Sequence, residues 1–137
     1  MSANKPMTTK ELYAQRNPFL FLAERMTDLT GEHGRHGKAQ CAIPKASETM
    51  CNLAVSHGEC LDGDAYIALR TLATLIEGYT CHNSPTYDDD HLKTLAGVGT
   101  MARLLTEVME ASQTLKFHAD NGLYLHGAIK AAEANHD

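Results

Sequence analysis

Two apolar stripes at helical spacing constrain the fold of this 137-residue chain more than any other feature. The first runs from Ala65 to Tyr79 and the second from Leu92 to Met109, with apolar residues recurring every three or four positions. Because such residues share one face of an α-helix, each stripe predicts an amphipathic helix that must bury this face against a neighbour. The residues expected to form the core are Leu69, Leu72, Ile76, Leu95, Ala102 and Leu105.

Capping residues and glycines divide the rest of the chain into further predicted helices. Asn17 is a favourable N-cap for a helix over Pro18–Thr30, and Gly58 and Gly63 favour a break between two later helices. The expected fold is therefore mainly α, a compact bundle of about five helices in one domain over 1–137. After a short helical segment at 8–17, the predicted helices cover 18–30, 45–57, 64–79, 89–113 and 128–134.

Two segments lack a clear helical pattern. Residues 114–127 alternate in polarity around Asn121-Gly122, which favours a short β-hairpin near 115–125 over a helix end, a loop and a new helix. Residues 31–45 form a glycine- and histidine-rich loop, with a short strand expected at 40–43. Long loops within compact domains are either functional or mobile, so the sequence leaves both alternatives open for this one.

Charge is distributed unevenly along the chain. The first 45 residues hold seven Lys and Arg against four acidic residues, whereas residues 46–137 hold five against thirteen. Nucleic-acid binding requires a basic face, so the acidic body argues against it. The asymmetry instead suits steering of a charged partner or association between protomers, although a merely uneven solvated surface would look the same.

The basic residues of the loop are the candidate contact with a partner. Arg35, Lys38, His33 and His36 lie together in a stretch that suits an anionic surface on another protein, and the alternative is a connector without a role. A phosphate-binding loop is excluded because Glu32 occupies the position of the first glycine and Ala39 follows the lysine.

Eight histidines and four cysteines make a zinc site a second candidate. Zinc requires about four ligands, usually as two close pairs that the fold brings together. No CxxC spacing is present, and reduced cysteines often pack as small apolar residues, so the alternative is that they belong to the core. The candidate ligands are Cys41, His57, Cys60, Cys81 and His82.

Catalytic motifs do not stand out in the sequence. No G-x-S-x-G elbow occurs, and adjacent side chains such as Cys81 and His82 diverge on a regular backbone. A small enzyme remains an alternative, for which a cleft containing His118, Tyr124 or His126 would be the place to look.

The N-terminal residues 1–6 are polar, and no apolar run approaches the roughly 20 residues that cross a bilayer. We therefore expect no signal peptide, no membrane association, a cytoplasmic location and reduced cysteines. The broad apolar surface predicted for 89–113 favours a homo-oligomer, most simply a dimer. Together these features predict a non-catalytic binding or regulatory protein, an adaptor or inhibitor of another protein of bacterial or phage type, that self-associates. The alternatives are a zinc-binding module and a small enzyme.

Overall fold

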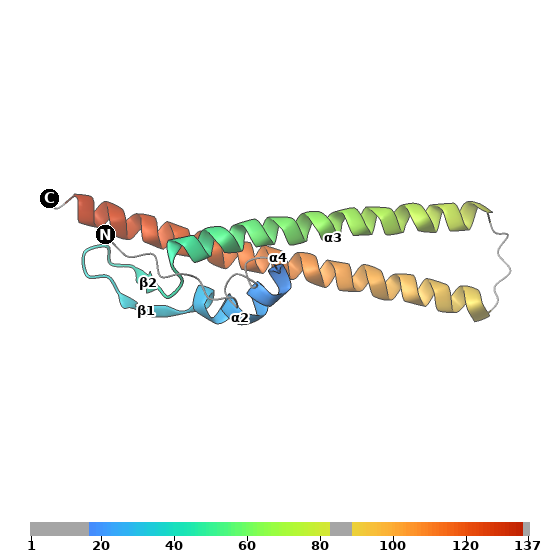
Figure 1. The fold of residues 1–137 in the computed structure, drawn as a ribbon, viewed down its shortest axis with the longest axis horizontal. Coiled ribbons are helices and arrows are strands. Elements are labelled where there is room, and N and C mark those ends of the chain that lie inside the picture. The colour runs from blue at the N-terminus through green and yellow to red at the C-terminus, as the bar shows by residue number, and fades with distance from the viewer. Residues whose placement is uncertain (1–16, 83–88, 136–137) are drawn as a thin grey trace.

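Two long antiparallel helices form the axis of the molecule. The computed structural model describes residues 17–82 and 89–135, and Figure 1 shows an elongated helical hairpin with a short helix and a small sheet at one end. The two long helices have 35 and 46 residues, so at about 1.5 Å per residue they extend for about 50 Å and about 70 Å. The elements are α2 (Pro18–Thr30), β1 (Glu32–Arg35), β2 (Ala42–Pro44), α3 (Glu48–His82) and α4 (Asp89–Ala134).

The mainly α class is confirmed, and so is the helix predicted at Pro18–Thr30. The Asn17 side chain accepts hydrogen bonds from the backbone N–H groups of Phe19 and Leu20, at 3.1 and 3.2 Å, and thereby caps α2. The prediction of about five helices is wrong for the described part of the chain, which contains three. The segment predicted at 8–17 lies outside the described residues.

The predicted break at Gly58 does not occur, because α3 continues through it. A Cβ atom at this position would meet the Lys116 side chain and would lie 3.1 Å from the carbonyl oxygen of Ser112, both on α4. Glycine here permits the two helices to approach each other. The burial of Leu61 and Ala65 directly after it favours a continuous helix over the modest propensity cost of glycine, about 1 kcal/mol.

The predicted β-hairpin near 115–125 is also wrong, because these residues belong to the uninterrupted helix α4. Leu115, Ala119 and Gly122 are all buried, and their spacing of four and three residues places them on one face. A Cβ at Gly122 would lie 2.7 Å from Cys51 Sγ. The Asn121-Gly122 pair therefore serves a close helix contact instead of a turn.

The glycine- and histidine-rich segment 31–45 forms a two-stranded antiparallel sheet, with Glu32 opposite Pro44 and Arg35 opposite Ala42. The strand expected at 40–43 is found at Ala42–Pro44, whereas its partner β1 was not predicted. The connecting turn is closed by hydrogen bonds from the N–H of His36 to the carbonyl of Cys41, at 2.8 Å, and from the N–H of Gln40 to the carbonyl of His36, at 2.9 Å.

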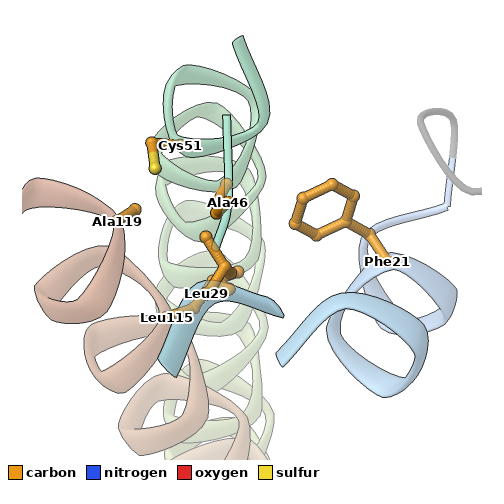
Figure 2. Packing of buried hydrophobic residues seen from close by; sticks show 7 residues of the cluster. Phe21, Leu29, Ala46, Cys51, Leu115 and Ala119 are labelled. Atoms are coloured by element: carbon orange, nitrogen blue, oxygen red, sulfur yellow. The ribbon is translucent and has the colours of Figure 1, made fainter. Parts of the chain in front are cut away.

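The buried core lies at the end of the hairpin where α2 packs against α3 and α4. We call this end the base. Figure 2 shows side chains from all three helices, together with Ala46, meeting there. The core predicted from the two stripes is wrong in its location, since Leu95 is exposed and the other five residues are half-buried. They lie where only two helices meet, and two helices bury little more than the line of contact between them. The buried apolar residues are Phe21, Leu29, Ala46, Cys51, Ala54, Leu61, Ala65, Leu115 and Ala119.

The contact between Gly122 and Cys51 predicts that Gly122→Ala destabilises the protein by about 1–3 kcal/mol, because the added methyl group overpacks a buried site. Gly127 is a matched control in the same helix, where an added Cβ meets nothing, so Gly127→Ala should stabilise by up to about 1 kcal/mol. Urea denaturation measures both effects. Adding Cys51→Ala should remove part of the loss at Gly122, and strict additivity of the two changes would contradict the proposed contact.

Candidate functional site

The half of the helical hairpin away from the base carries most of the exposed large apolar side chains found among the described residues. We call residues 66–79 of α3 and 93–108 of α4 the arm. Its exposed large apolar side chains are Tyr66, Ile67, Leu75, Leu95, Met101 and Leu104.

A groove of about 450 Å³ runs between the two helices of the arm. None of its lining side chains is charged, and the hydroxyl of Thr71 already donates to the carbonyl of Ile67 at 2.9 Å. This surface can therefore be covered by another apolar surface without leaving a lining polar group unsatisfied. The groove is lined by Ala68, Thr71, Leu72, Leu75, Met101, Leu104 and Leu105.

A second groove, of about 230 Å³, continues this surface toward the base. The two grooves share Leu104, and the second is bordered by Phe19 and Leu22 of α2. Helix α2 therefore lies on the same side of the helical hairpin as the first groove, and its N-terminal end borders the second groove. The remaining lining residues are Leu61, Glu107, Val108 and Ala111.

The candidate partner-binding residues lie at the base, on the small sheet and its turn. His33, Arg35 and Lys38 are exposed, as expected of a contact surface. His36 is half-buried and has structural contacts, because its Nδ1 accepts a hydrogen bond from the N–H of Ala39 at 3.1 Å, and its Nε2 lies 3.6 Å from a carboxylate oxygen of Glu133. The structure thus gathers all four residues in one place and leaves three of them accessible.

Two polar contacts tie the end of α4 to the start of α3 beside this sheet. Lys130 donates to the Glu48 carboxylate at 2.5 Å, and this bond holds the pKa of Glu48 below its ordinary value. His126 Nε2 lies 2.8 Å from the carbonyl oxygen of Ala46. These contacts link α4 to the residues that directly follow β2.

The candidate zinc ligands come from separate places in the fold. His57 is buried and Cys60 is exposed, although they are only three residues apart on α3. Cys81 and His82 end the same helix, about 30 Å beyond Cys60 along its axis. Half-buried Cys41 directly precedes β2. In residues 17–82 and 89–135 no three His, Cys, Asp or Glu side chains gather as a metal site would require.

The residues named for an enzymatic cleft lie on the surface of α4. Tyr124 is exposed, and His118 and His126 are half-buried. Neither of the two grooves contains any of them.

His57, one of the candidate zinc ligands, packs in the contact between α2 and α3, which the sequence did not predict. Its ring packs against Phe21 of α2, with 4.9 Å between the ring centroids, and its Nε2 has no hydrogen-bond partner among the described residues. Burial lowers the pKa of His57. This neutral ring therefore belongs to the contact that holds α2 on the hairpin.

Comparison with protein-family models, with curated proteins and with solved structures finds no match to this chain. In the described ranges, neither long helix combines the length and hydrophobicity that crossing a membrane requires.

Burial of His57 predicts a loss of stability in mild acid. In the unfolded chain its pKa is about 6.5, whereas in the folded protein the pKa is lower, so the unfolded state binds the proton first as pH falls. The free energy of unfolding should decrease from about pH 6.5 downward, until the folded-state pKa is also passed. His57→Phe should flatten this part of the curve in urea denaturation between pH 7 and 5, whereas His33→Gln on the exposed strand should not. Parallel curves for wild type and His57→Phe would contradict this role.

Proposed function

We propose that this chain is a non-catalytic binding or regulatory protein that contacts another protein through the β-hairpin of residues 31–45. The observation that carries the proposal is the exposure of His33, Arg35 and Lys38 on an ordered two-stranded sheet at the base. An ordered surface loses less conformational entropy on binding than a mobile loop does.

Charge indicates the kind of partner. The segment 31–45 holds three Lys or Arg residues and one carboxylate, whereas the chain from residue 46 onward is strongly acidic. A local basic surface on an acidic protein favours an acidic patch on the partner and orients the encounter, because the rest of the surface repels that patch. An adaptor or inhibitor that works by occupying such a patch fits this geometry.

A cytoplasmic setting is part of this proposal. Cys41, Cys51 and Cys60 are free thiols, as expected in a reducing compartment. A zinc-binding role has less support, because Cys41 lies before β2 and the other candidates are spread along α3, and no three potential ligands gather among the described residues.

The test is the double substitution Arg35→Ala and Lys38→Ala, which should weaken capture of the partner and reduce its dependence on salt. Tagged wild type and variant are used to capture proteins from the native host at two salt concentrations, and the bound proteins are quantified by mass spectrometry. The matched control is Arg70→Ala with Arg103→Ala, which removes the same charge from exposed positions on the arm. Equal loss of partner capture in both variants, or no loss in either, would reject the β-hairpin as the contact surface.

A further inference from the structure

One apolar stripe runs along each long helix from the base into the arm. Its side chains are buried at the base and exposed in the arm. On α3, Leu61, Ala68 and Leu75 are spaced seven residues apart and so lie on one face. Leu61 is only 4% exposed beside α2, Ala68 is half-buried, and Leu75 is 64% exposed. Among the described residues, the same apolar face is thus buried where α2 covers it and exposed beyond the N-terminal end of α2.

The stripe on α4 shows the same change. Ala111 and Val108 are half-buried next to α2, whereas Leu104 and Met101, which continue the face toward the arm, are 52% and 59% exposed. The sequence therefore maintains an apolar face for at least two turns beyond the last residue that this chain is seen to cover. A bare face of this kind is typical of an interface.

We propose that the arm packs face to face against the arm of a second copy of this chain, which forms a four-helix bundle. A single helix lying in the groove would cover its floor, but the apolar surface also extends over the outer flank of α3 through exposed Ile67, one turn before Thr71. A second layer of two helices covers both. A second copy carries the same uncharged groove, so in an isologous contact each arm covers the apolar face of the other.

The area of the arm agrees with a dimer of moderate affinity. From Leu95 to Val108, α4 extends for about 20 Å, and two helices side by side are about 20 Å wide, so the flat face is about 400 Å². Side-chain ridges raise the accessible area above this value, and two facing copies therefore bury on the order of 1,000 Å². This is the lower end of the range for specific interfaces, which predicts a monomer–dimer equilibrium at micromolar concentration.

This contact is separate from the proposed partner-binding hairpin, since the sheet lies at the base and the bare groove lies on the arm (Figure 1). Charged substitutions of the residues that line the groove should abolish dimerisation and leave the charge of the β-hairpin at 31–45 intact. Arg35→Ala with Lys38→Ala should leave dimerisation unchanged, so that failure of either proposal can be recognised independently.

Light scattering and sedimentation equilibrium of the full chain test the inference. The wild type should change from about 15.0 kDa toward twice this mass as concentration rises through the micromolar range. Leu75→Glu with Leu104→Glu should remain monomeric throughout, because two carboxylates would then face an apolar surface. Both side chains are more than half exposed in the single chain, so circular dichroism should show unchanged helix content.

The matched control is Phe117→Glu with Tyr124→Glu, which also replaces two exposed large apolar residues but lies outside the arm and changes neither groove. It should dimerise as the wild type does. Hydrogen exchange should show arm amides that are protected in the wild-type dimer and exchange faster in Leu75→Glu with Leu104→Glu. A wild type that is still monomeric at about 100 µM would overturn the inference. This holds also if the arm amides are protected in that monomer, because another part of the same chain would then cover the arm. Dimers that persist in Leu75→Glu with Leu104→Glu would also overturn it.

Discussion

The close approach of α3 and α4 at the base is the contact on which the rest of the structure depends. Glycines at positions 58 and 122 allow it, one on each helix, and each faces a side chain of the other helix. Leu115 and Ala119 fill the space between these two points and are completely buried. Because helices packed this closely interdigitate through short side chains, the base fixes the axial alignment of both helices, and the arm extends from that alignment.

The base and the arm differ in how their apolar faces are covered. At the base, α2 adds a third helix and encloses a core, with the Phe21 and His57 rings in contact across the interface. In the part of the chain that the structure describes, the two helices of the arm pack only against each other, and their outer apolar residues are exposed. A helical layer needs a second layer to enclose a core, so the arm is an incomplete unit within one chain. Its composition is consistent with a unit that is completed by association.

The two ends of the molecule therefore carry surfaces of opposite chemistry. The arm offers an uncharged groove, while the base offers exposed cationic side chains on a small sheet supported by the end of α4. Burial of apolar area contributes affinity, whereas charges at an exposed surface contribute orientation and specificity. The two proposals therefore place self-association at one end of the molecule and partner binding at the other.

The sequence by itself determined the helical class, the start and end of α2, and the apolar faces of both long helices. Each of these depends on local chemistry, such as the Asn17 cap or the spacing from Ala65 to Tyr79. It also marked Arg35 and Lys38 as a basic surface, although it could not show that a two-stranded sheet and its turn would hold them.

Only the tertiary structure decided that Gly58 and Asn121-Gly122 lie inside helices, since their local preference is to end one. That preference is worth about 1 kcal/mol, and contacts with residues far away in the sequence outweigh it where two helices must nearly touch. The location of the core was decided in the same way. Amphipathic periodicity identifies the face of a helix that seeks cover, but how much of that face is covered depends on where a third helix packs, and this is a property of the whole chain.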